Sequence, residues 1–204
     1  MKFKFILFLL VFSFHLSYSQ KKKYYLDQYS KQITKREFNN FDNIPYEYIR
    51  IAYENDTAKV NKIEIREVKG KLDKNTHNAI IQFLARKDAK VVDDSKTIII
   101  NYYPGRDQCN STGNPYYVID LYKNFLAEIK FDRNVNQYFF YNSSDGLDFF
   151  QGYFNWLEDD DKLFEKQFFP LHYPWGSYVI IYPNGDYYVY KGEYYILDIL
   201  HKIR

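Results

Sequence analysis

Residues 177–190 read SYVIIYPNGDYYVY, and this stretch decides the fold. Its first six residues form an apolar, β-branched run that is typical of a strand, and residues 186–190 have the aromatic and β-branched character of a second strand. Proline, asparagine and glycine at 183–185 favour a tight turn between the two. The stretch therefore predicts a β-hairpin.

Strand and helix patterns alternate on both sides of this hairpin. The apolar TIII run near the start of residues 96–103 suits a central strand that is buried on both faces. Asn114 and Pro115 are a typical helix start, with proline at the first helical position. The remaining expected elements are a strand at 137–141, a helix at 159–168 and a closing helix at 194–203.

The first part of the mature chain, residues 20–92, predicts an α+β extension. Residues 46–53 and 60–68 alternate as two strands of a hairpin, and a helix is expected from Asp73 or Asn75 to about Lys87. Thr34 and Glu37 have capping-box spacing, which predicts a short helix from residue 35. We therefore divide the mature chain into this extension and a domain at 93–204.

From residue 93 onward the order is strand, cysteine loop, helix, strand, helix, hairpin, helix. Three motifs accompany this order: Cys109-Asn110-Ser111-Thr112 after the first strand, Pro174 before SYVII, and the 183–185 turn. Together they resemble the secreted thioredoxin-like proteins of bacteria. The resemblance implies an α/β fold, in which a thioredoxin-like central sheet is flanked by helices.

In that family a C-x-x-C motif opens the first helix, and a proline that is commonly cis precedes the hairpin. The resemblance places Cys109, Thr112 and Pro174 at the corresponding site, with catalytic roles only if the chain is redox-active. Pro170 is a competing candidate for the proline. Because Thr112 stands where the second cysteine would be, the motif is degenerate.

Cys109 is the only cysteine of the chain, so no intramolecular disulfide can form. A dithiol cycle needs a second thiol to resolve the mixed disulfide. We therefore expect a non-catalytic protein or an interaction module. A monothiol thiol–disulfide oxidoreductase is the first alternative, since a helix N-terminus favours a thiolate. A disulfide-linked dimer through Cys109 also remains open. Peroxiredoxins have a threonine three residues before the reactive cysteine, and Arg106 occupies that position here, which argues against peroxide chemistry.

An aromatic-rich ligand-binding module is the second alternative. The chain has 23 Tyr, 18 Phe and 2 Trp residues, and such rings can form platforms for sugars or peptides. Several coplanar exposed rings in one groove would favour this alternative. The candidate residues are Tyr116, Tyr117, Tyr153, Phe154, Trp156, Tyr173 and Trp175.

Composition excludes several other functions. His77, His172 and His201 lie far apart and in no metal-ligand spacing, and no nucleotide-binding fingerprint is present, so we expect neither metal nor cofactor. Without Lys2 and Lys4, the mature chain has 26 basic and 26 acidic residues. This neutral balance argues against nucleic acid and leaves an unknown protein or small ligand as the expected partner.

Residues 1–19 predict a cleavable signal peptide. Lys2 and Lys4 precede an apolar run, FILFLLVFSF, at 5–14, and Ser17 and Ser19 supply small residues at the −3 and −1 positions of a cleavage site. Ten apolar residues are too few to span a bilayer as a helix. We therefore expect cleavage near Ser19, export to the periplasm or medium, and no membrane insertion afterwards.

Overall fold

The computed structural model describes residues 21–41, 46–111, 114–131 and 134–203. The predicted signal peptide and its cleavage site lie outside these ranges. Within them, no helix has the length and apolar character to cross a membrane.

The predicted hairpin is confirmed. Strand β8 (Ser177–Ile181) pairs antiparallel with β9 (Asp186–Lys191), and the register places Tyr178 opposite Tyr190. At the turn, the Gly185 amide donates to the Tyr182 carbonyl at 2.9 Å. Gly185 has a φ of 84°, which glycine adopts without steric cost.

The large sheet has the strand order β4-β9-β8-β5-β6-β7. Its central strand β5 (Thr97–Tyr103) pairs antiparallel with β8 and parallel with β6 (Val135–Tyr141). Helix α4 (Pro115–Ile129) joins β5 to β6, α5 (Leu163–Phe168) precedes β8, and α6 (Asp198–Ile203) follows β9. This arrangement is a thioredoxin-like α/β fold, as the sequence predicts.

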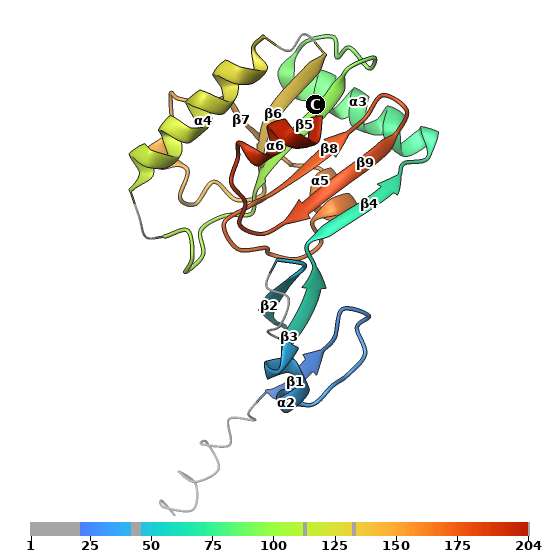
Figure 1. The fold of residues 1–204 in the computed structure, drawn as a ribbon, viewed down its shortest axis with the longest axis vertical. Helices are drawn as coiled ribbons and strands as arrows, with labels where there is room; N and C mark the ends of the chain where they lie inside the picture. The colour runs from blue at the N-terminus through green and yellow to red at the C-terminus, as the bar shows by residue number, and fades with distance from the viewer. Residues whose placement is uncertain (1–20, 42–45, 112–113, 132–133, 204) are drawn as a thin grey trace, which may run out of the picture.

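Helices cover both faces of this sheet (Figure 1). Side chains alternate along each strand, so neighbours such as Ile99 and Ile100 enter different cores. One core contains Phe125 of α4 and Leu200 of α6. The other contains α5 and α3 (Lys74–Asp88), and Phe140 lies within it.

Two further strands extend the sheet at its edges. Strand β7 (Trp156–Glu158) pairs parallel with β6, and β4 (Glu67–Lys71) pairs antiparallel with β9. Both β4 and α3 come from the segment 20–92, and α3 begins at its predicted cap, Asp73. The part of that segment that forms a separate sheet is thus confined to residues 22–65.

This small sheet has the order β1-β3-β2 and lies beyond the N-terminal end of β4 (Figure 1). Its strands are β1 (Lys22–Leu26), β2 (Tyr48–Glu54) and β3 (Ala58–Ile65). Helix α2 (Lys35–Asn39) accompanies it, and its predicted capping box between Thr34 and Glu37 is present.

The prediction of a single strand over residues 60–68 is wrong, because the chain passes from the small sheet to the large sheet at Arg66. The Arg66 amide donates to the Glu47 carbonyl at 2.9 Å, and its carbonyl accepts from the Lys191 amide at 3.0 Å. Its guanidinium donates to the carbonyls of Tyr48, Lys191 and Glu193. Arg66 therefore hydrogen-bonds to both sheets, and alternation alone cannot reveal that change.

Two helices begin later than the sequence predicts. The carboxylate of buried Asp159 accepts from the amides of Leu163, Phe164 and Glu165, so the first turn of α5 starts at Leu163. Burial raises the pKa of Asp159, against the effect of these amides. Before α6, residues 194–197 form an irregular segment.

The ion pairs of Glu64 should make the stability of the junction between the two sheets depend on pH. Burial opposes its ionisation, but hydrogen bonds and charges from Lys62 and Lys191 outweigh it and lower its pKa below 4.5. Because the folded-state pKa is depressed, the stabilisation is present above pH 4.5 and is lost as the pH falls through the folded value. Glu64→Gln should lower the free energy of unfolding by about 2 kcal/mol at pH 7, which is somewhat less than the effect of breaking a fully buried ion pair. Urea unfolding of both proteins checks this: the difference should shrink below pH 4.5, and a constant difference would contradict it.

Candidate functional site: an aromatic groove beside the cysteine turn

Cys109 lies exposed in a turn that follows β5. Helix α4 begins six positions later, at Pro115, with Asn114 as its cap. Cys109 therefore does not open the helix, unlike the first cysteine of the C-x-x-C motif that the resemblance implies. Thr112 lies outside the described residues.

The carboxylate of Asp107 holds this turn against the loop before β8. It accepts from the Cys109 and Asn110 amides at 2.7 and 2.8 Å, and from the Trp175 amide at 3.1 Å. His172 Nε2 lies 3.2 Å from the same carboxylate. Burial opposes ionisation, but these hydrogen bonds outweigh it and lower the pKa of Asp107.

The same contacts bring Pro174 close to the cysteine turn, since Pro174 directly precedes Trp175. No peptide bond among the described residues is cis. Pro170 is exposed at the end of α5. Trp175 has a φ of 69°, which is unusual for a bulky residue, and its amide is held by Asp107.

Asp107→Ala should therefore release both loops. Three amides would lose a charged acceptor, and we expect the free energy of unfolding to fall by about 1.5 kcal/mol. The amides of Cys109, Asn110 and Trp175 should exchange with solvent at least tenfold faster in NMR hydrogen exchange. Asp145→Ala is the control, because the Asp145 side chain forms an exposed ion pair with Arg106, and the backbone hydrogen bonds of Asp145 do not depend on its carboxylate. Unchanged exchange at Trp175 would contradict this role of Asp107.

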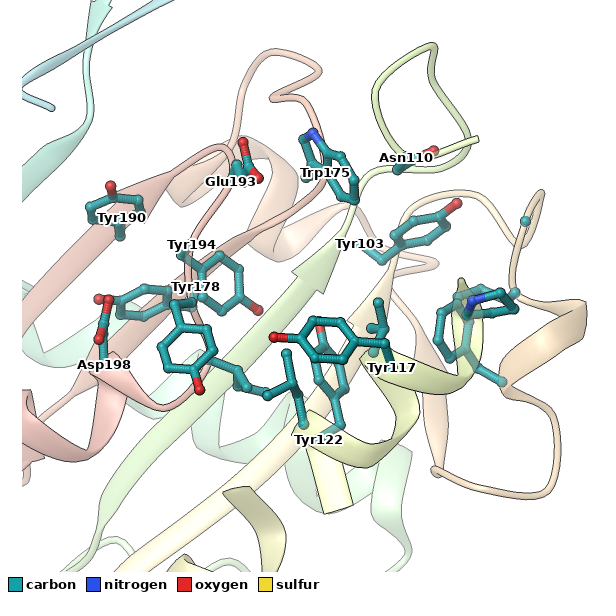
Figure 2. Close-up of a pocket in the computed structure, with 18 of the residues that line it drawn as sticks. Tyr103, Asn110, Tyr117, Tyr122, Trp175, Tyr178, Tyr190, Glu193, Tyr194 and Asp198 are labelled. Atoms are coloured by element: carbon teal, nitrogen blue, oxygen red, sulfur yellow. The ribbon is translucent and has the colours of Figure 1, made fainter. Parts of the chain in front are cut away.

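A groove of about 1190 Å³ runs from this turn along the face of the sheet that carries α4 and α6. Of its 29 lining residues, 13 are Phe, Trp or Tyr, and Figure 2 shows several of these rings around one hollow. Both tryptophans of the chain line it. The aromatic lining residues are Tyr46, Tyr103, Tyr117, Tyr122, Phe149, Phe150, Trp156, Trp175, Tyr178, Tyr188, Tyr190, Tyr194 and Tyr195.

Packing fixes the tyrosines on the sheet side of the groove. Tyr178 stacks on Tyr190 with ring centroids 5.6 Å apart and meets Tyr194 edge-on at 4.8 Å. Asn101 on β5 donates to the Tyr194 hydroxyl at 2.8 Å. Burial raises the pKa of both Tyr178 and Tyr194, so these hydroxyls stay neutral. This wall is preformed.

Two buried polar atoms in the lining have no hydrogen-bond partner among the described residues: the Tyr188 hydroxyl and the Trp156 indole nitrogen. A buried polar group without a partner costs free energy, so a ligand that supplies a hydrogen-bond partner to either atom would gain affinity.

At the mouth of the groove, burial and the nearby Asp107 and Asp145 raise the pKa of Tyr103 to about 12.

Three of the aromatic candidates from the sequence line the groove: Tyr117, Trp156 and Trp175. The others do not, although Tyr116 is equally exposed on the same helix. Tyr173 is buried elsewhere, and Tyr153 and Phe154 lie outside the lining. The sequence reasoning missed the tyrosines of β8 and β9, although the hairpin register places Tyr178 opposite Tyr190.

Metal-binding residues do not gather at this site. Within the part of the chain that the structure describes, no three His, Cys, Asp or Glu side chains are placed to hold a metal ion. His172 instead contacts Asp107, and His201 is exposed on α6.

No family model and no curated protein sequence matches the chain. Among solved structures, it is similar to BsSco, described as a member of the Sco family of cytochrome c oxidase assembly proteins, in which a disulfide switch was identified. Sequence identity is 11%, the TM-score is 0.34, and the match covers 78% of this chain and 91% of that chain. The fold assignment rests on the strand order and helix placement described above.

Proposed function

We propose that this chain is an exported thioredoxin-fold protein that binds a ligand in the aromatic groove and carries out no dithiol chemistry. The observation that carries the proposal is the groove itself, in which rings from five separate parts of the chain (46, 103, 117–122, 149–156 and 175–195) line one hollow. Exposed Tyr117 and Trp175 stand at its mouth, as a binding platform requires. Pockets of this aromatic character are the usual form of small-molecule sites.

The cysteine turn supports a binding role over a redox role. The chain has one cysteine, so it cannot resolve a mixed disulfide by itself. The Cys109 and Asn110 amides, which could otherwise stabilise a thiolate, donate to Asp107. Cys109 itself is not among the residues that line the groove, whereas Asn110 and Ser111 are. In this arrangement the turn forms one wall of the binding site.

A titration with the neutral fluorophore N-phenyl-1-naphthylamine tests the proposal. We expect saturable binding at one site, with the probe's emission rising. Energy transfer from the protein's two tryptophans should accompany it, because both line the groove. Absence of saturable binding, or binding without energy transfer, would contradict the proposal.

Cys109→Ser separates binding from thiol chemistry. We expect the variant to bind the probe with unchanged affinity, because Cys109 does not line the groove. We also expect that neither protein accelerates the reduction of insulin by dithiothreitol. Catalysis of insulin reduction by the unmodified protein, lost in Cys109→Ser, would instead support the monothiol oxidoreductase.

A further inference from the structure

A chain of hydrogen-bonded polar side chains leads to the groove from the interior of the large sheet. The Gln137 amide on β6 donates to the side-chain oxygen of Asn101 at 2.9 Å, and the Asn101 amide donates to the Tyr194 hydroxyl at 2.8 Å. The Tyr194 hydroxyl also interacts with the hydroxyl of Tyr122 on α4. Tyr122 and Tyr194 both line the groove, and Figure 2 shows the Tyr194 hydroxyl pointing toward the side of the hollow where Tyr122 lies.

Asn101 is the polar exception in its strand. It follows the apolar run Ile98–Ile100 on the central strand β5, and it is only 1% exposed. A buried side-chain amide costs free energy unless it is hydrogen-bonded, and an apolar residue would occupy this position without that cost. The contact that Asn101 makes toward the groove is with the Tyr194 hydroxyl, so its amide fixes the position of that hydroxyl.

The chain leaves one hydroxyl proton without an acceptor. Because Asn101 donates to Tyr194, the two tyrosines have two hydroxyl protons for one mutual hydrogen bond. Burial raises the pKa of both hydroxyls. Beyond burial, their hydrogen bond raises the pKa of Tyr194 and lowers the pKa of Tyr122, as expected when Tyr194 donates. The proton of Tyr122 then has no acceptor among the described residues, and a ligand in the groove can supply one.

The surroundings of this proton suit an uncharged acceptor. Among the described residues, no charged side chain forms a hydrogen bond or ion pair with any member of the chain. The lining cations Arg66 and Lys202 instead contact rings of β9. A carboxylate placed here would lose hydration without gaining a cation, whereas a carbonyl oxygen loses far less and gains the hydrogen bond. The hydrogen bonds behind the free hydroxyl polarise it and strengthen it as a donor.

We propose that the groove binds an uncharged small molecule through an oxygen that accepts a hydrogen bond, such as a ketone carbonyl. The hydroxyl pair of Tyr122 and Tyr194 donates to this oxygen, and the apolar body of the ligand packs against the surrounding rings. Asn101 is a positioning residue, since it acts on the ligand through Tyr194. This inference rests on the proposed function and adds the class of ligand to it. The volume of about 1190 Å³ leaves ample room for such a molecule.

Three probes that share a naphthalene body test the preference for an uncharged acceptor. 2-Acetylnaphthalene carries a ketone, 2-isopropenylnaphthalene has a methylene group in place of the ketone oxygen, and 2-naphthoate carries a carboxylate. Their affinities are measured at pH 7 by displacement of N-phenyl-1-naphthylamine. We expect the ketone to bind about fivefold more tightly than the olefin, which is the effect of one hydrogen bond. The carboxylate should bind more weakly than the ketone, because its hydration is lost without compensation.

Tyr122→Phe combined with Tyr194→Phe tests the assigned residues, because it removes both hydroxyls and keeps both rings. We expect the ketone to bind no more tightly than the olefin, with the olefin affinity unchanged, which also shows that the variant is folded. The control is Tyr116→Phe combined with Tyr153→Phe, which removes two exposed hydroxyls outside the groove and should keep the preference for the ketone. A measurement without a variant uses a carbon-13 label at the carbonyl, whose NMR signal should lie downfield of its position in an aprotic solvent when the ketone is bound.

The outcomes separate this inference from the proposed function. Equal binding of the ketone and the olefin, an unshifted carbonyl signal, or a ketone preference that survives in the Tyr122/Tyr194 variant would overturn the assigned hydrogen bond. Tighter binding of the carboxylate than of the ketone would overturn the assignment to an uncharged ligand. In each case the proposed function would still stand, because N-phenyl-1-naphthylamine binds. Failure of N-phenyl-1-naphthylamine itself to bind would instead contradict the proposed function.

Discussion

Replacing Tyr117 and Trp175 together with alanine is expected to weaken the binding of N-phenyl-1-naphthylamine about 50-fold, since two aromatic contacts contribute about 2–3 kcal/mol. Both rings line the groove, and their side chains are partly exposed, so they can be truncated without opening the core. Overall stability should therefore change little. The effect of the double variant on affinity tests the platform at the mouth of the groove directly.

The probe's own emission is the readout, because Trp175→Ala removes one of the two tryptophan donors. Tyr116→Ala is the matched control: Tyr116 is 67% exposed on α4, next to Tyr117 at 61%, but it does not line the groove. The control should bind like the unmodified protein. Equal losses in Tyr116→Ala and in the double variant would show that the groove does not hold the probe.

Phe140→Ala is expected to lower the free energy of unfolding by about 4 kcal/mol. Phe140 has no exposed surface and lies on β6 in the core that α3 and α5 cover. Its ring centroid is 5.6 Å from that of Phe83 and 4.7 Å from that of Phe164. Truncation would leave a cavity between both helices and the sheet.

Urea unfolding followed by circular dichroism measures this loss. Phe131→Ala serves as the control, because Phe131 is 85% exposed and should change stability by less than about 0.5 kcal/mol. A loss below about 1 kcal/mol in Phe140→Ala would contradict the packing of α3 and α5 against this face of the sheet.

The hairpin and the central strand were predictable because their signals are local. A turn formed by proline, asparagine and glycine allows few conformations, and a run of β-branched residues as apolar as Ile98–Ile100 fits few places other than a sheet interior. The helix N-caps Thr34, Asp73 and Asn114 were equally predictable, since a capping side chain binds backbone amides within three residues of itself.

The change of sheet at Arg66 was not predictable from alternation. Strands β3 and β4 are almost continuous in sequence, and only the partners Tyr48, Lys191 and Glu193 fix the break. Two of these partners lie more than 100 residues away. Asp159 is a similar example, because its carboxylate caps a helix from outside the helical pattern.

The groove was only partly visible in the sequence. Aromatic residues are so abundant that composition could not separate lining rings from core rings: Tyr116 and Tyr117 are neighbours, yet only Tyr117 lines the groove. Tyr178, Tyr188 and Tyr190 share one face of the hairpin, and the register could have grouped them. Their meeting with Trp156 and Tyr117 depends on the fold.

Intermolecular nuclear Overhauser effects between bound N-phenyl-1-naphthylamine and the protein are the most direct test of the groove as the functional site. We predict effects from the probe to the side chains of Tyr117, Trp156 and Trp175 in one complex. Effects confined to exposed rings outside the groove, such as Tyr29 and Phe131, would contradict the account.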